Sequence, residues 1–138
     1  MQLLPDDDCF AIRQAARYVS QLYDRHLAPV GLTITQFSIM NKLRRAGSMT
    51  MRQLADAMVM ERTTLVRALQ PLQRDGLVSG RNATSRGRGL SLSLTPDGQA
   101  RFAAARLCWR AAQGDFERRF GAERAALLRG ELFDMTKA

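Results

Sequence analysis

Four polar residues between positions 62 and 67 have the types and the spacing to read DNA bases. They are Arg62, Thr63, Thr64 and Arg67, at the start of a helix predicted from about residue 62 to residue 75. The arginine fork can bind O6 and N7 of guanine, and threonine can contact bases, phosphates or thymine methyl groups. In a helix-turn-helix, the N-terminal residues of the second helix meet base edges in the major groove. This segment therefore predicts a DNA-reading helix, against the plain alternative of a solvated surface without a specific role.

The segment before this helix supplies the first half of such a motif. Thr50 and Gln53 form a capping box that predicts the start of a short helix, and Thr50 is counted among the DNA-contacting residues. A break at residues 59–61 separates the two helices. Pro71 lies inside the second helix, and because proline removes a backbone donor we expect a kink or an irregular last turn there.

A basic β-hairpin is predicted directly after the second helix. One strand begins at residues 77–78, and residues 89–94 alternate apolar and polar side chains as a half-buried strand does. The polar segment between them carries Arg86 and Arg88, which we expect to enter the minor groove, whose negative potential attracts arginine. A helix, a break, a second helix and a hairpin make the layout of a winged helix-turn-helix.

The remaining segments predict long helices on both sides of this motif. Apolar residues spaced by three and four indicate a helix over residues 9–27, and Thr33 with Gln36 forms a capping box for another. A long helix follows Thr95 and Pro96, and a last one follows Gly121. The predicted fold is mostly α with a small β-hairpin wing. It is one domain over residues 1–138, with a DNA-binding lobe at about 33–95 and dimerisation helices at about 8–28 and 96–136.

Charge and composition favour a nucleic-acid partner and exclude several other classes. The net charge is +8, and the sequence pI is about 10.9. One histidine and two cysteines provide neither a zinc motif nor a catalytic set, so we expect no enzyme activity, no metal and no cofactor. The sequence has no apolar run of the roughly 18 residues that a membrane span needs and no basic signal start, so we expect a cytoplasmic protein without membrane contact.

The order of several short motifs resembles the MarR family of bacterial transcription regulators. The matching segments are 31–33, 36–37, 54–55 with 58, 62–65, 74–78, and 92–95 with 98. The resemblance implies a homodimer that binds double-stranded DNA at a palindromic operator, acts as a repressor and is released by a small molecule or an oxidant. The hairpin departs from the family pattern, because Arg86 stands where an acidic residue usually orients the arginine that Arg88 matches.

The resemblance leaves two kinds of switch open. Residues 9–11, Cys-Phe-Ala, are similar to the start of the organic-hydroperoxide-sensing branch, and Tyr23 matches a tyrosine that contacts the reactive cysteine there. That set is incomplete, since a second tyrosine is replaced by Ile34, and Cys9 also reads as a plain packing residue. The other switch is a small aromatic or anionic ligand between the dimer helices and the DNA-binding lobe, with the residues Tyr23, His26, Phe37, Met40 and Trp109 around it.

Two further readings share the basic surface but not the sequence-specific function. A non-specific architectural DNA-binding protein would show a steep salt dependence and little discrimination between sequences. A protein-interaction module on a winged fold would show no salt-dependent binding to DNA.

Overall fold

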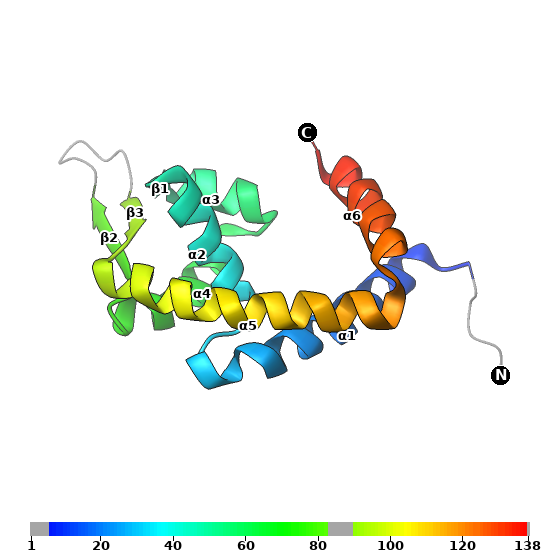
Figure 1. Ribbon diagram of the computed structural model, residues 1–138. Coiled ribbons are helices and arrows are strands. Elements are labelled where there is room, and N and C mark those ends of the chain that lie inside the picture. The colour runs from blue at the N-terminus through cyan, green and yellow to red at the C-terminus, as the bar shows by residue number, and fades with distance from the viewer. Residues whose placement is uncertain (1–5, 83–89, 138) are drawn as a thin grey trace.

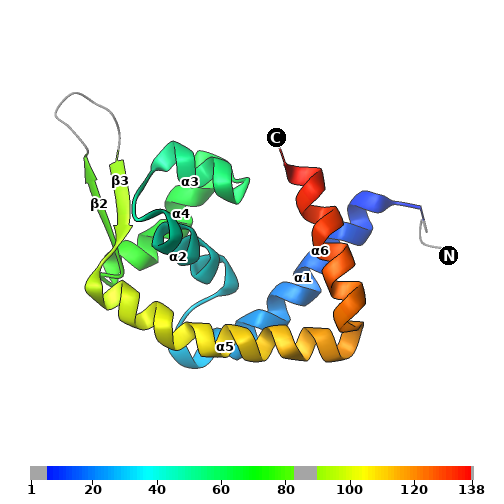
Figure 2. The ribbon, with the colours of Figure 1, turned by 45° about the horizontal axis from the view of Figure 1, so that its top comes forward.

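The computed structural model describes residues 6–82 and 90–137 and contains six α-helices and three short strands within them (Figure 1). In chain order the elements are α1 (Asp8–Leu27), a 3-10 turn (Ala28–Val30), α2 (Ile34–Ala46), β1 (Met49–Thr50), α3 (Met51–Met58), α4 (Arg62–Arg74), β2 (Val78–Asn82), β3 (Leu90–Leu94), α5 (Pro96–Phe120) and α6 (Ala122–Thr136). The hairpin, α2, α3 and α4 form a lobe at one end of α5, and α6 leaves the other end (Figures 1 and 2). Helix α1 packs along α5.

Local capping fixes the helix starts that the sequence predicts. The Thr33 hydroxyl accepts a hydrogen bond from the Gln36 amide at 3.2 Å, and the Gln36 side chain accepts one from the Thr33 amide at 2.9 Å. The same reciprocal pair joins Thr50 and Gln53 at the start of α3. Both predicted capping boxes are confirmed, and each satisfies two backbone donors that a helix start leaves free.

The break between α3 and α4 is confirmed at the predicted position. Val59 has a φ of 53°, in the left-handed region that β-branched residues rarely adopt, and its amide donates to the end of α3. Helix α4 then begins at Arg62 and continues through Pro71 to Arg74. Pro71 therefore does not end the helix, and the expected kink stays a prediction.

The sheet has one strand more than the sequence predicts. Its order is β1-β3-β2 with antiparallel pairing, and β1 pairs Met49 with Leu92 and Thr50 with Ser91. Two residues are too few to show an alternating pattern, so sequence reasoning missed β1. The strand joins the N-terminus of α3 to the base of the hairpin and fixes the two relative to each other.

The core of the lobe fills the space between these elements. Its fully buried side chains include Ile39, Met40, Leu43, Leu54, Leu65, Leu69, Leu72 and Leu92. Phe102 of α5 joins this core and stacks on Phe37 of α2, with 4.8 Å between ring centroids. The start of α5 is thus anchored in the lobe, while the rest of it extends away as an arm (Figure 2).

None of the helices in the described part of the chain has the length and apolar character to cross a membrane.

Candidate nucleic-acid interface

The rotation of α4 about its axis is set by three leucines. Leu65, Leu69 and Leu72 are at most 1% exposed and pack into the lobe. Arg62, Thr63, Thr64 and Arg67 are all exposed, as the sequence predicts, and of these Thr63 and Arg67 lie opposite the leucines. The burial of one leucine stripe therefore presents the four candidate DNA-contacting side chains together on the outside of the lobe.

The open side of α4 carries uncompensated positive charge. Arg62 and Arg67 form no ion pair with any residue in the described ranges, whereas Arg74 pairs with Asp75 at 3.3 Å. Glu61 precedes α4 and makes no side-chain cap bond. The β2-β3 hairpin lies in the same lobe and contacts α4 through β2 (Figure 1). This surface suits an anionic partner.

The three other residues of the predicted set have a different status. Thr50 is half-buried, and its hydroxyl accepts the Gln53 amide at 3.1 Å, so it has a structural role and its contact with DNA stays a prediction. Arg86 and Arg88, predicted for the hairpin tip, lie outside the described residues.

Sequence reasoning missed two exposed residues on the same side of α4. Val66 is 36% exposed and Gln70 is exposed, and both follow Thr63 at helical spacing, by three and seven residues. The spacing was readable from the sequence, because Leu65 and Leu69 already mark the buried stripe. A valine on a polar helix was passed over because periodicity alone does not distinguish an exposed apolar side chain from a core one.

A second candidate site is an apolar groove of about 610 Å³ between α1, α5 and α6. Of the predicted effector residues, only Tyr23 and Trp109 line it. Phe37 and Met40 are buried in the core of the lobe, and Cys9 is exposed on α1 outside the groove. The groove adds polar residues that the sequence did not single out, Gln113 and Arg129, because their positions depend on how three helices pack.

Tyr23 is held at the wall of this groove. Its hydroxyl donates to Oε1 of Gln113, whose amide nitrogen donates to Glu117 at 3.1 Å. Burial raises the pKa of Tyr23, and the charge of Glu117 adds to the rise, while Arg129 opposes it. The hydroxyl therefore stays a neutral donor bound to Gln113, and a redox role of Cys9 through Tyr23 stays a prediction.

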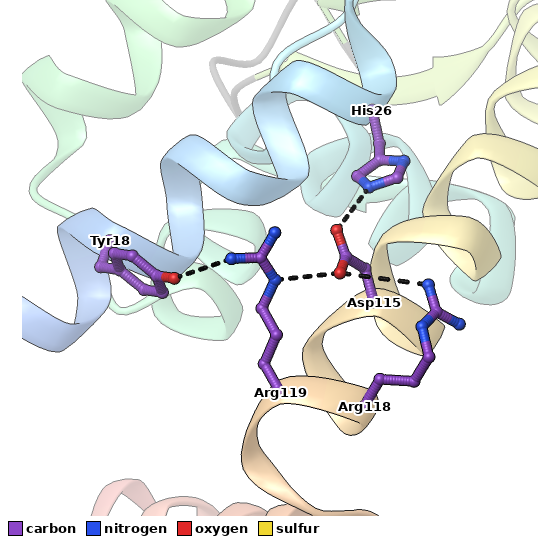
Figure 3. Close-up of polar contacts among 5 residues, drawn as sticks. All are labelled: Tyr18, His26, Asp115, Arg118 and Arg119. Carbon is purple, nitrogen blue, oxygen red and sulfur yellow. Dashed lines mark hydrogen bonds and ion pairs between the residues drawn. The ribbon is translucent and has the colours of Figure 1, made fainter.

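His26, the remaining predicted effector residue, belongs to a polar cluster between α1 and α5. Its Nε2 lies 3.2 Å from Oδ2 of Asp115, whose other oxygen accepts from Arg119 at 3.0 Å and lies 4.0 Å from Arg118 (Figure 3). Arg119 also donates to the Tyr18 hydroxyl at 3.2 Å. Asp115 thus connects two turns of α1 to α5 and helps to fix the angle between these helices.

Replacing Asp115 with asparagine should lower the melting temperature at neutral pH, with a difference that shrinks in acid. Hydrogen bonds from Arg119 and then from His26 hold the pKa of the Asp115 carboxyl below its ordinary value of 3.8. A lowered pKa in the folded state gives stability that is present above the unfolded value and is lost as the pH falls through the folded value. Thermal melts of both proteins between neutral pH and about pH 3 measure this convergence.

Asp134→Asn is the matched control, because Asp134 forms only an exposed pair with Lys137 near the end of α6. Its melting temperature should follow the wild type at every pH. An Asp115→Asn difference that stays constant down to about pH 3 would contradict the ionic role of the carboxylate.

The lobe geometry defines the class of protein. Two short helices joined by a tight turn, an exposed basic second helix and an antiparallel hairpin directly behind it make a winged helix-turn-helix.

Comparison with known proteins identifies the family. Residues 32–85 match the profile of the MarR family. The chain is 32% identical to the M. tuberculosis transcriptional regulator MosR, with a TM-score of 0.78 over 96% of this chain and 99% of that one. A probable transcriptional regulator from Pseudomonas aeruginosa is 26% identical, with a TM-score of 0.84 over 96% and 99%. The chain belongs to the MarR family.

A curated relative supports the same family. The multiple antibiotic resistance protein MarR of Salmonella typhimurium is 31% identical over 80 residues, which cover 58% of this chain and 56% of that protein. The chain spans 56–66% of the length of the curated relatives it matches.

Proposed function

We propose that this protein is a homodimeric regulator of transcription that binds a palindromic DNA operator in a sequence-specific way and represses the adjacent genes. The observation that carries the proposal is the exposed pair Arg62 and Arg67 on α4, which form no ion pair within the described part of the chain, beside the hairpin. The DNA complex of M. tuberculosis MosR, a relative 34% identical to this chain, supports DNA as the partner. The repressor role rests on the family resemblance.

A second copy of the chain is the partner that the helical arm suggests. Apolar side chains of α1 and α6 are uncovered in a single chain, among them Phe10 at 48%, Ile12 at 45% and Phe133 at 66% exposure. Ile12 and Phe133 line the apolar groove that α1, α5 and α6 enclose. The proposal therefore assigns residues 8–28 and 96–136 to dimerisation and residues 33–95 to DNA binding. Two-fold symmetry would place the two α4 helices about 34 Å apart, one turn of B-DNA.

Selection of bound sequences from a random duplex pool tests this function directly. We expect an enriched palindrome whose half-site centres are about ten base pairs apart. Competition with random duplex across a salt series separates this result from non-specific binding, which shows steep salt dependence and no enriched sequence. A pool that stays random after selection would reject the proposal and favour a non-specific architectural DNA-binding protein.

Arg67→Ala should weaken binding to the selected operator by at least about thirtyfold, because one base contact is worth roughly 1–3 kcal/mol and a dimer loses two. Binding to random duplex should weaken much less. Arg106→Ala is the matched control, since Arg106 is exposed on α5 away from α4 and its loss removes the same charge. Titration of labelled duplex measures both. Equal losses on operator and on random duplex would mean that Arg67 contributes charge and no base recognition.

We further propose that the groove holds the releasing ligand, a small aromatic anion, at its inner end. Tyr23, Gln113 and Arg129 supply polar groups there, and Arg129 matches a carboxylate. Trp109 lines the groove and stacks on Phe37 of α2, with 6.1 Å between ring centroids, so a shift of this ring would reach the lobe. Because Trp109 is the only tryptophan, its fluorescence measures occupancy in a screen of aromatic carboxylic acids.

A further inference from the structure

The open side of α4 contains an apolar and an amide side chain that the arginine surface does not explain. Thr63, Val66, Arg67 and Gln70 follow one another at steps of three, one and three residues, with Val66 at the flank of the buried leucine stripe and the other three further round the helix. All four are exposed, Val66 at 36%. The surface therefore combines the guanidinium group of Arg67, the carboxamide of Gln70 and the methyl groups of Val66.

The length of α4 that carries these side chains matches the length of a few stacked base pairs. From Thr63 to Gln70 the helix rises by seven residues, or about 10 Å at 1.5 Å per residue. Stacked bases are about 3.4 Å apart, so the distance matches three base-pair steps. Val66 and Gln70 are one turn apart and lie along one edge of the open side, while Arg67 lies toward the other edge.

We propose that Val66 and Gln70 together select A·T pairs next to the guanine bound by Arg67, so that each operator half-site contains a G·C pair beside an A·T step. The inference deepens the proposed function and rests on it. Glutamine pairs in a bidentate way with N6 and N7 of adenine, and an apolar side chain contacts the thymine methyl group. We assign this surface to the DNA major groove, because the segment between Glu61 and Asp75 carries arginines and no acidic residue.

The test uses modified bases in the operator that the wild-type protein selects. Each replacement is made in one half-site only, and replacing the thymine at its A·T step by uracil removes a single 5-methyl group. It should weaken wild-type binding by about fourfold, the equivalent of one buried methyl group. Replacing the adenine by 7-deazaadenine removes N7 and should weaken binding by about tenfold, within the range for a good bidentate pair. The Val66→Ala protein should be insensitive to uracil, and the Gln70→Ala protein insensitive to 7-deazaadenine.

Each variant is the control for the other, because the two side chains are assigned to different groups of the A·T step. The Val66→Ala protein should keep the wild-type response to 7-deazaadenine, and the Gln70→Ala protein should keep the wild-type response to uracil. Repeating the selection with Gln70→Ala should relax preference at the A·T step and keep the guanine.

The outcomes separate this inference from the proposed function. If the wild-type protein enriches no sequence, the proposed function fails and this inference fails with it. If it enriches a palindrome but neither modified base weakens binding, or both variants keep the full wild-type response, the assignment of Val66 and Gln70 is overturned while the regulator stands. Loss of each response in the corresponding variant alone supports the assignment.

Discussion

Replacing Leu132 and Phe133 with aspartate should convert the protein from a dimer into a monomer and abolish tight operator binding. Both residues line the groove between α1, α5 and α6 and are 38% and 66% exposed in a single chain. The proposed second copy would bury this remaining surface. Full burial of a leucine or phenylalanine is worth about 1.5–3 kcal/mol, so the part still exposed is worth about 1 kcal/mol for each side chain.

The effect is large because a dimer contains each residue twice. Four side chains at about 1 kcal/mol give about 4 kcal/mol, which weakens dimerisation roughly a thousandfold before the cost of burying the new charges is counted. A monomer can contact only one half-site, so operator affinity falls with it. Analytical ultracentrifugation at micromolar concentration measures the mass, and titration of labelled operator measures the affinity.

Leu127→Asp is the control for this double substitution. Leu127 lies on the same helix and is 73% exposed, but it does not line the groove. This variant should remain dimeric and bind DNA as the wild type does. A double variant that stays dimeric, or a wild-type protein that is monomeric at the same concentration, would contradict the proposed interface.

Gly98→Ala should destabilise the protein by about 1–3 kcal/mol, the usual cost of forcing an extra methyl group into a packed site. Gly98 is in the first turn of α5, and a Cβ atom there would overlap the carbonyl oxygen of Leu77. That oxygen accepts the Thr95 amide at 3.1 Å, and the Thr95 hydroxyl accepts the Gly98 amide at 3.0 Å. The methyl group must therefore push α5 away from the strand that begins at Val78.

The measurement is a thermal melt, in which the loss should lower the melting temperature by about 4–12 °C for a domain of this size. Gly130→Ala is the matched control, because Gly130 is inside α6 and a Cβ atom there meets no atom within 4 Å. That change should leave the protein unchanged or stabilise it by about 0.5–1 kcal/mol, because alanine favours a helix over glycine. Equal melting temperatures for Gly98→Ala and the wild type would show that α5 can move away from Leu77 without a loss of stability.

The sequence by itself determined the six helices and the starts of those with a capping residue. The two capping boxes, the cap formed by Thr95 and the break at residues 59–61 are all where the residues predict them. These features join residues three or four apart, so the physics that fixes them is contained in short segments. The period of the leucines in α4 likewise determined which side of that helix is open.

The tertiary structure decided which elements pack against the faces of the predicted helices and strands. Strand β1 forms because Met49 and Thr50 pair with β3, more than forty residues further along the chain. His26 contacts Asp115 across 89 positions, and Phe37 stacks on Phe102 in the core across 65. Helical period says which side chains share a face, but the partner of that face depends on how separate elements pack. For this reason the groove with Gln113 and Arg129 could not be read from the sequence, whereas the arginine surface of α4 could.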